Sequence, residues 1–295
     1  MPAETVAPRP PWIRTRFRAS DRYRGVIELL RAHDLSSVCE EAACPNISEC
    51  FGAGTATFMI LGDICTRACG FCAVTSGRPT GLDLGEAARL AEAIAALELN
   101  YAVITSVDRD DLADGGAGMF AACIRAIRER RPDCGVEVLI PDFEGNWDAL
   151  ATVIEAGPAV LNHNIETVPR LYPRVRPNAR YERSLELISH VRALGPSTAT
   201  KSGLMVGLGE TFEELVEAMS DLYDAGCELV TIGQYLRPTA KHLPVARYYE
   251  PSEFDALAAA GRELGLMLVE AGPLVRSSYH AAEQADAAAA RRSDG

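Results

Sequence analysis

The stretch TFMILGDICTRACGFC (residues 57–72) decides the fold, because it joins a short apolar run directly to three closely spaced cysteines. Its first part, TFMILG (57–62), has the length, apolar composition and final glycine of a buried strand. Cys65, Cys69 and Cys72 then follow with C-x3-C-x2-C spacing. Because α/β barrels place their chemistry in loops that leave the C-terminal ends of the strands, this stretch predicts a functional cysteine loop at the end of the first strand.

The rest of the chain alternates between similar apolar strands and amphipathic helices. Further strands are predicted at 101–106, 136–140, 159–162, 202–207 and 229–233. Helices are predicted at 85–97, 116–130, 147–156, 180–194, 211–225 and 252–265. Such alternation is typical of parallel strands covered by helices. Six units do not complete an eight-unit barrel, so we expect an α/β fold with an open, partial (β/α)6 barrel; a doubly wound sheet is the alternative.

The barrel is expected to span residues 53–270, with an extension at each end. Residues 1–52 form an N-terminal extension that is Pro-rich at its start and carries three further cysteines. Residues 271–295 form a C-terminal extension that ends in AAEQADAAAARRSDG (281–295). Because this tail is Ala-rich and charged, we expect it to be a frayed helix or disordered.

The composition is that of a globular protein with an excess of acidic residues. The 295 residues include 41 acidic and 29 basic side chains, which gives a net charge of −12. This charge disfavours broad binding to nucleic acids or to anionic membranes. No apolar run approaches the ~20 residues that span a bilayer, and the N-terminal sequence lacks the apolar core of a secretory signal. A cytoplasmic protein without nucleic-acid or membrane partners is therefore expected.

Six of the nine cysteines form two triplets, and a reducing cytoplasm disfavours disulfides, so we expect the clustered thiols to hold metal. The first triplet is Cys39, Cys44 and Cys50, with C-x4-C-x5-C spacing. The second triplet is Cys65, Cys69 and Cys72. The remaining cysteines fall within or beside predicted helices and are expected to be inert core thiols: Cys123, Cys134 and Cys227.

Three thiolates match a closed zinc site poorly, because such a site needs four ligands. They suit a cubane iron–sulfur cluster in which the protein leaves one iron unligated. Gly70 and Phe71 fit a tight, shielded loop around such a cluster. The open alternatives are a zinc site completed by a distant histidine, chance reactive thiols and, for the first triplet, a redox pair.

The second triplet, with an aromatic residue before its last cysteine, resembles the motif of radical S-adenosylmethionine (SAM) enzymes. GLMVGLGE (203–210) resembles the G-x-I-x-G-x-x-E strand and loop of that superfamily, with Met205 where isoleucine is usual. TSVDRDD (105–111) ends the second strand, where the superfamily often contacts SAM. The resemblance implies a partial barrel and a [4Fe-4S] cluster on Cys65, Cys69 and Cys72 that cleaves SAM to a 5′-deoxyadenosyl radical. The implied SAM contacts are Thr105, Ser106, Asp108, Gly207 and Glu210.

The order of the motifs more narrowly resembles the lipoyl synthase family. That family places C-x4-C-x5-C ahead of the radical SAM motif and completes an auxiliary [4Fe-4S] cluster with a serine of a C-terminal R-S-S-Y motif. Here RSSY occupies 276–279, so the resemblance implies Ser278 as the ligand, with Ser277 as the alternative. The likeness extends over nearly the whole chain and includes PRPPWIR (8–14), residues 160–177 and residues 231–248.

The resemblance implies insertion of two sulfur atoms, at C6 and C8 of an octanoyl group on a lysine of a lipoyl carrier domain. The second triplet would serve SAM cleavage, and the cluster on the first triplet would give up its sulfur. The implied carriers are the E2 component of 2-oxoacid dehydrogenases and the glycine cleavage H protein. A flavodoxin- or ferredoxin-type reductant and an iron–sulfur carrier that rebuilds the auxiliary cluster are the other implied partners.

Two rival functions remain open on the sequence. Another radical SAM sulfur-inserting enzyme, such as a biotin synthase-like or methylthiolating one, would share the second triplet but not its combination with the first triplet and RSSY. A non-catalytic zinc protein would use the six cysteines as a scaffold.

Polar residues also follow the fourth strand, and each has two interpretations. Asn164 and Glu166 are candidate contacts for the ribose of SAM or for a substrate amide. Alternatively, they form hydrogen bonds at the end of the strand. His163 is a proton carrier or a structural histidine. Arg176 and Arg237 bind a carboxylate, as arginine does bidentately, or form surface salt bridges. In the N-terminal arm, the basic residues that either steer an acidic carrier or are simply solvated are Arg14, Arg16 and Arg18.

Overall fold

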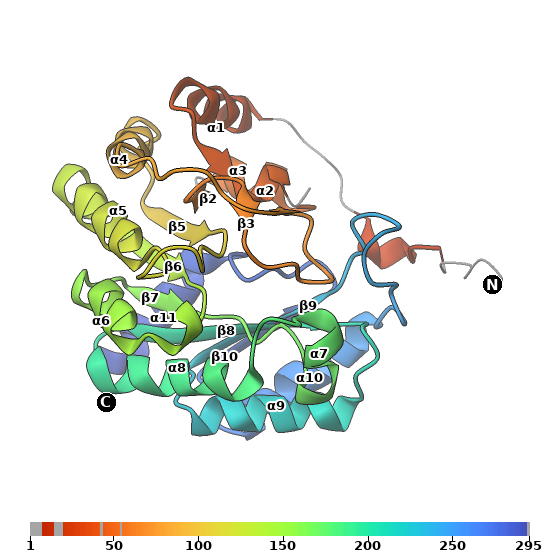
Figure 1. Cartoon of the computed structure of the whole chain (residues 1–295). Coiled ribbons are helices and arrows are strands. Elements are labelled where there is room, and N and C mark those ends of the chain that lie inside the picture. The colour runs from red at the N-terminus through yellow and green to blue at the C-terminus, as the bar shows by residue number, and fades with distance from the viewer. Residues whose placement is uncertain (1–7, 15–19, 42–43, 54, 294–295) are drawn as a thin grey trace.

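The computed structural model describes residues 8–14, 20–41, 44–53 and 55–293 (Figure 1). Its centre is an eight-stranded sheet in the order β1-β2-β5-β6-β7-β8-β9-β10. The edge strand β1 (Ser36–Ser37) is antiparallel to β2, and all other neighbours in this sheet are parallel. The parallel strands are β2 (Thr55–Ile60), β5 (Tyr101–Ser106), β6 (Gly135–Leu139), β7 (Val160–Asn162), β8 (Ala199–Val206), β9 (Leu229–Gln234) and β10 (Leu268–Gly272).

All six predicted strands are present, and the parallel sheet confirms the expected α/β class. The seventh parallel strand, β10, was not predicted. β10 pairs with β9 alone, at the edge of the sheet, and is mostly half-buried. An edge strand needs fewer apolar residues than a central one, so its sequence LVEAG lacks the apolar run that marked the other strands. Among the described residues no pairing joins β1 to β10, so the sheet is open, as the partial barrel requires.

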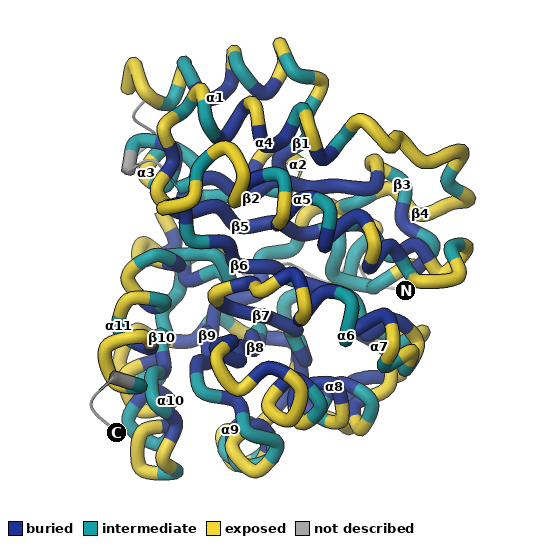
Figure 2. The backbone as a smooth tube through the Cα atoms, turned by 90° about the vertical axis from the view of Figure 1, so that its left-hand side faces the viewer, coloured by how far each residue is buried: buried dark blue, intermediate teal, exposed yellow. Residues whose placement is uncertain are grey.

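Six crossover helices lie side by side in chain order and bury their inner faces (Figures 1 and 2). In β5, Ala102 and Ile104 pack into the core that the first four of these helices share, whereas the alternate residues Tyr101 and Val103 face the other way. The helices thus form one layer, unlike the two layers of a doubly wound sheet. They are α4 (Glu86–Ala96), α5 (Ala117–Arg130), α6 (Trp147–Glu155), α8 (Tyr181–Leu194), α9 (Phe212–Asp224) and α10 (Pro251–Glu263).

The N-terminal extension packs onto the same core as the barrel. Ser20 accepts a hydrogen bond from the Tyr23 backbone N–H and so caps the first helix, which buries Val26 and Leu30 near Phe51. The elements there are η1 (Pro11–Ile13), α1 (Asp21–Ala32), α2 (Val38–Glu41) and α3 (Ile47–Ala53). The short elements of the connecting loops are β3 (Ile64–Cys65), β4 (Thr75–Ser76), η2 (Phe143–Gly145), η3 (Pro169–Leu171) and α7 (Tyr172–Val175).

The Ala-rich tail forms a packed helix, α11 (Ala281–Ser293), so the expectation of a frayed or disordered segment was wrong there. Ala281 packs against Tyr101 and Val103, on the face of the sheet that the crossover helices leave open. Ala288 packs against the first residues of β7, β8 and β9, which are Val160, Ala199 and Leu229. Small side chains permit this close approach, and α11 closes the N-terminal end of the partial barrel.

A buried ion pair fills the same inner face of the barrel. Lys201 Nζ lies 3.1 Å from Glu137 Oε1, and both side chains are almost wholly excluded from solvent. Tyr101 OH donates to Glu137 Oε2 (3.2 Å), and Asn162 Nδ2 donates to Glu137 Oε1 (3.4 Å). Because a buried charge is costly without partners, these bonds favour one register of β5, β6, β7 and β8.

Replacement of Ala288 by Asp tests the packing of α11. The substitution places a carboxylate against apolar strand residues, so we expect a loss of about 3 kcal/mol in the free energy of unfolding, measured in urea. Ala290→Asp is the matched control, because Ala290 is exposed on the same helix, and it should cost only about 0.5–1 kcal/mol through helix propensity. Equal losses in the two variants would contradict a packed α11.

Candidate functional site

The second cysteine triplet lies on the loop after β2, as predicted. Cys65 belongs to β3, which pairs with β4, and its side chain is buried. Asp108, after the end of β5, lies beside it. The Asp108 backbone N–H donates to Cys65 Sγ (3.3 Å), and the Cys65 thiol donates to Asp108 Oδ2 (3.4 Å). The structure therefore brings the first cysteine of the motif to the C-terminal end of the neighbouring strand.

Two segments from distant parts of the chain hold the far end of this cysteine loop. The Gly70 backbone N–H donates to Val175 O (2.9 Å), and Gly70 O accepts from the Leu243 N–H (3.0 Å). His242 Nε2 lies 2.9 Å from Cys72 O. A Cβ atom on Gly70 would lie 3.0 Å from the Leu243 side chain, so glycine permits this close crossing.

The environment of the three thiols disfavours their ionisation. Burial raises the pKa of Cys65 and Cys72 to about 11 and that of Cys69 to about 12. The thiols are also close enough that a Cys65 thiolate raises the pKa of Cys72, and a Cys72 thiolate that of Cys69. Three thiolates in this loop therefore require a compensating positive charge, which iron would supply.

Arg67, inside the cysteine loop, is the centre of a buried ion network. Its Nε and Nη2 donate to the two carboxylate oxygens of Asp110 (2.8 and 2.7 Å), and Nη2 also donates to Asp142 Oδ1 (2.7 Å). Burial alone would raise the pKa of Asp142, but the hydrogen bond and charge of Arg67 lower it to about 2. Arg183 also binds Asp142 (3.2 Å). The network ties the cysteine loop to the ends of β5 and β6.

Polar side chains gather at the ends of β5 and β7. Asn164 Nδ2 donates to Glu166 Oε1 (3.0 Å), and Arg176 Nη1 donates to Asn164 O (2.7 Å). Burial raises the pKa of Glu166, whose φ of 66° is in the left-handed region. Within the described part of the chain, the buried atoms Ser106 Oγ, Asn164 Oδ1 and Arg176 Nε have no hydrogen-bond partner. Such unsatisfied groups are costly, which is typical of a site that a ligand completes.

The predicted SAM contacts differ in how far their side chains are already engaged. Thr105 Oγ1 donates to Leu139 O (3.1 Å), and Asp108 Oδ2 accepts from the Cys65 thiol. The Ser106 hydroxyl, in contrast, has no hydrogen-bond partner among the described residues. Glu210 accepts from the backbone N–H groups of Gly207 (2.5 Å) and Leu208 (2.9 Å), so its carboxylate shapes the loop after β8.

Tight packing around Gly207 explains the second glycine of the GLMVGLGE motif. Its φ is +99°, and a Cβ atom there would lie 2.1 Å from Gln234 Nε2 and 2.6 Å from Arg247 O. Thr211 and Glu214 then form a capping box that starts α9. The loop is therefore fixed between β8 and α9 by the close packing around Gly207 and by the capping box.

The other polar candidates are bonded within the fold. His163 is fully buried between Ile140 O and Ser184 Oγ (both 2.9 Å), and burial lowers its pKa to about 4, so the structural interpretation holds for this residue. Arg237 donates to two carbonyl oxygens of its own loop. Neither Arg237 nor Arg176 forms a salt bridge with any described residue.

The first triplet spans the two short helices before the barrel, with Cys39 in α2 and Cys50 in α3. The Cys44 N–H donates to Cys39 O (2.9 Å), and the two thiols are also hydrogen-bonded. That thiol bond lowers the pKa of Cys44 to about 6 and raises that of Cys39, while burial raises the pKa of Cys50 to about 12. Cys44 is thus the thiol of this triplet that ionises most readily.

The C-terminal extension returns to this triplet from the other end of the chain. Asn46 Nδ2 donates to Leu274 O (2.6 Å), and Tyr279 OH donates to Glu49 Oε1 (3.2 Å), across 228 and 230 residues of sequence. These two bonds, one before the RSSY motif and one at its last residue, hold the motif beside the triplet. Gln284 of α11 donates to Tyr279 O (2.9 Å) and holds the segment from behind.

The position of RSSY agrees with the ligand predicted there. The charge of Arg276 adds to the Cys39 hydrogen bond in lowering the pKa of Cys44. Ser277 and Ser278 follow directly and are half-buried. Either hydroxyl belongs to the segment that lies against the triplet, so the choice between them stays a prediction.

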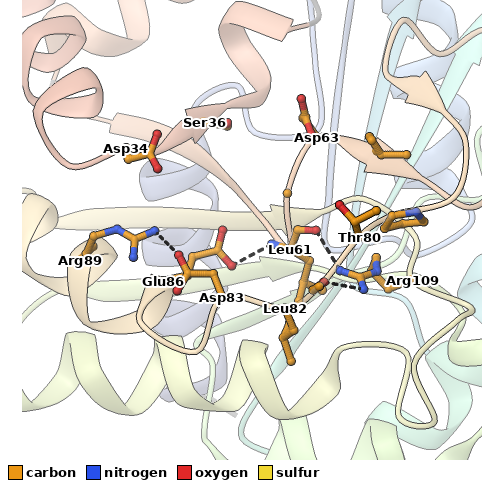
Figure 3. A pocket seen from close by; sticks show the side chains of 14 residues that line it. Asp34, Ser36, Leu61, Asp63, Thr80, Leu82, Asp83, Glu86, Arg89 and Arg109 are labelled. Carbon is orange, nitrogen blue, oxygen red and sulfur yellow. Dashed lines mark hydrogen bonds and ion pairs between the residues drawn. The ribbon is translucent and has the colours of Figure 1, made fainter.

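A separate cavity of about 570 Å³ is lined in part by residues that come directly before the cysteine loop, among them Leu61 and Asp63 (Figure 3). Glu86 accepts from the Leu61 N–H (2.9 Å), and Arg109 donates to Leu61 O (3.3 Å) and Gly81 O (3.0 Å). Its lining contains Ile64 but no cysteine. These charged groups are bonded to the protein itself, and the cavity is not the site that the motifs predict.

Cys123, Cys134 and Cys227 are buried, as expected of core thiols. Arg14 is exposed, whereas Arg16 and Arg18 lie outside the described residues. Over the described ranges no helix is long and apolar enough to cross a membrane, and no three His, Cys, Asp or Glu side chains are grouped to hold a single metal ion.

Sequence reasoning missed two residues that position the cysteine loop, Arg67 and His242. Arg67 was visible as a charged residue inside the motif, and the aspartates after the second strand were its available partners. His242 had no comparable signal, because its contact with Cys72 O spans 170 residues.

Comparisons with known proteins show the family of the chain. The model of the radical SAM superfamily matches residues 59–222. A lipoyl synthase of Symbiobacterium thermophilum is 58% identical over 287 residues, which cover 97% of this chain and 90% of that protein. A lipoyl synthase of Methylococcus capsulatus is 60% identical over 278 residues, which cover 94% of this chain and 86% of that protein.

Solved structures support the fold at much lower identity. The [FeFe]-hydrogenase maturase HydG has a TM-score of 0.57 and 15% identity, and the match covers 85% of this chain and 63% of that one. Methylornithine synthase (PylB) has a TM-score of 0.54 and 13% identity, covering 84% of this chain and 69% of that one. At these identities the likeness shows the fold alone.

Replacement of Arg67 by Met tests the role of the buried network. The change leaves the Asp142 and Asp110 carboxylates without this partner, so we expect the free energy of unfolding to fall by about 3–5 kcal/mol. We also expect a lower iron content, measured after reconstitution. Arg89→Met is the control, because Arg89 pairs with the exposed Asp83 and such surface pairs contribute about 0–1 kcal/mol. A stable Arg67→Met protein with full iron would contradict the positioning role.

Proposed function

The chain belongs to the lipoyl synthase family of radical SAM enzymes, and we propose that it inserts sulfur at C6 and C8 of an octanoyl group on a lysine of a lipoyl carrier domain. One observation carries the proposal: two cysteine triplets occupy different parts of one fold, and the C-terminal RSSY segment lies against the first. Such an arrangement suits two clusters with different tasks.

The residues of the second site fit a [4Fe-4S] cluster and SAM. Cys65, Cys69 and Cys72 are soft donors on one loop, without a fourth cysteine beside them. The unsatisfied Ser106 Oγ and Asn164 Oδ1 offer partners for a polar ligand. Gly203 leaves room there, because a Cβ atom would lie 2.6 Å from Asn164 Oδ1.

The residues of the first site fit a second cluster with one weaker ligand. Cys39, Cys44 and Cys50 provide three thiolates, and Ser278 or Ser277 provides an alkoxide. Alkoxide binds iron more weakly than thiolate does, so the iron it holds is released more easily. The Arg276 guanidinium beside Cys44 offsets part of the negative charge of these donors.

When bound, the groups at the two sites supply a 5′-deoxyadenosyl radical at the second triplet and sulfide at the first. The protein residues orient and shield this chemistry. Arg67 and Asp108 fix the second loop at the strand ends, and Gly207 and Glu210 fix the loop after β8. Asn164, Glu166 and Arg176 provide polar contacts for SAM, and Thr105 holds the end of β5 in place.

The proposed partners follow from this chemistry. The carriers are an octanoylated E2 component of a 2-oxoacid dehydrogenase or glycine cleavage H protein. A flavodoxin- or ferredoxin-type protein supplies electrons, and an iron–sulfur carrier rebuilds the cluster that loses sulfide. We place the protein in the cytoplasm, where these partners and reduced thiols would be found.

The test of the function is mass spectrometry of a peptide with octanoyl-lysine, incubated anaerobically with the reconstituted enzyme, SAM and dithionite. We expect a gain of two sulfur atoms and release of 5′-deoxyadenosine. Deoxyadenosine with an unmodified peptide would contradict the substrate, and zinc without sulfide in the protein would contradict both enzyme interpretations.

The division of labour is tested by replacing each triplet with alanine. Without Cys39, Cys44 and Cys50, we expect SAM cleavage to persist while sulfur insertion falls below detection. Without Cys65, Cys69 and Cys72, both activities should be lost. Circular dichroism checks that each variant is folded. Loss of SAM cleavage in a folded variant of the first triplet would count against two separate tasks.

The serine ligand is tested with a matched pair of variants. We expect Ser278→Ala to lose sulfur insertion and part of the iron, because an alanine offers no oxygen, while SAM cleavage continues. Ser277→Ala changes a neighbour with similar exposure and should retain insertion. The reverse result would assign the ligand to Ser277, and no effect of either variant would remove serine from the site.

A further inference from the structure

Three segments near the cysteine loop contain basic residues but no acidic ones. They are residues 8–14, 168–181 and 235–249, and together they hold nine arginine and lysine residues and no aspartate or glutamate. This composition is unusual in a chain with 41 acidic and 29 basic residues. The basic residues are Arg9, Arg14, Arg170, Arg174, Arg176, Arg180, Arg237, Lys241 and Arg247.

The three segments adjoin one another in the structure. Gly70 in the cysteine loop bonds to Val175 of one segment and to Leu243 of another. Trp12 Nε1 donates to Tyr249 O (3.0 Å), which attaches the N-terminal segment to the end of the third. Figure 1 shows the N-terminal segment at the right of the molecule. We call these three segments the basic rim. It borders the cysteine loop at the C-terminal end of the sheet.

Only part of the charge in the basic rim is neutralised by neighbours. Arg170 pairs with Glu214, and Arg247 pairs with Glu253. Five other cations are exposed and form no ion pair with any residue that the structure describes: Arg9, Arg14, Arg174, Arg180 and Lys241. The rim therefore presents unpaired positive charge directly beside the candidate site.

We propose that the basic rim docks an acidic surface of the octanoylated carrier domain, next to the lysine that bears the octanoyl group. The proposal rests on the proposed function and adds the charge and place of the docking surface. Complementary charge would speed encounter and orient the carrier so that its lysine faces the cysteine loop. A compact acidic protein fits better than a long polyanion, which the net charge of −12 elsewhere would repel.

The test compares two substrates with the same octanoyl-lysine: the whole carrier domain and a short uncharged peptide. In the double variant Arg174→Glu/Lys241→Glu, the initial rate at low carrier concentration should fall roughly tenfold or more. The rate with the peptide should not change, because the peptide lacks the acidic surface. The salt dependence of the carrier reaction should also become weaker.

The matched control is Arg125→Glu/Arg262→Glu, which reverses two exposed cations on the outer helices α5 and α10. It makes the same change in net charge and should leave both rates and the salt dependence as in the parent protein. A similar loss in the control would mean that net charge acts rather than the rim, and it would overturn the proposal.

The other outcomes are distinguishable. An equal loss of rate with carrier and peptide, or no loss of rate with either, would overturn docking at the rim. Neither result would contradict the proposed function. If the parent protein modifies neither substrate, the proposed function fails first. The parent protein could instead bind a 20-nucleotide DNA or anionic vesicles more tightly than the carrier. If the rim variant loses that binding, the rim belongs to another polyanion and the carrier is rejected.

Discussion

A guanidinium buried in the cysteine loop determines where the second triplet lies. The loop between β2 and α4 has little regular backbone pairing of its own, apart from the short β3–β4 bridge. Arg67 compensates by joining Asp110 and the fully buried Asp142. A carboxylate as deeply buried as Asp142 would be costly without a cation, so the same contact that offsets this charge also fixes the loop to two strands.

The two ends of the barrel have different roles. At the C-terminal end of the strands, loops with polar and cysteine side chains leave several buried atoms without partners. At the N-terminal end, the alanines of α11 and the Glu137–Lys201 pair fill the interior. A closed end that is filled by apolar and ion-paired side chains supports an open end, and function is concentrated at the open end, where the cysteine loop lies.

The first triplet depends on contacts across almost the whole chain. Its cysteines lie within twelve residues of one another, but the segment that borders them comes from beyond residue 270. Contacts of such sequence separation carry a high cost in loop-closure entropy until the barrel between them has formed. The packing of α11 and the bond from Gln284 to Tyr279 O help to hold the returning segment in place.

The sequence by itself determined the class of the fold, six of its seven parallel strands, the six crossover helices and both cysteine triplets. It could do so because apolar periodicity and ligand spacing are local properties. It did not reveal β10, the packed α11, the partners of Arg67 or the contact of His242 with Cys72 O. These depend on which surfaces meet after folding: alanines form a packed helix only where a sheet face is left open, and an arginine becomes an anchor only where distant carboxylates surround it.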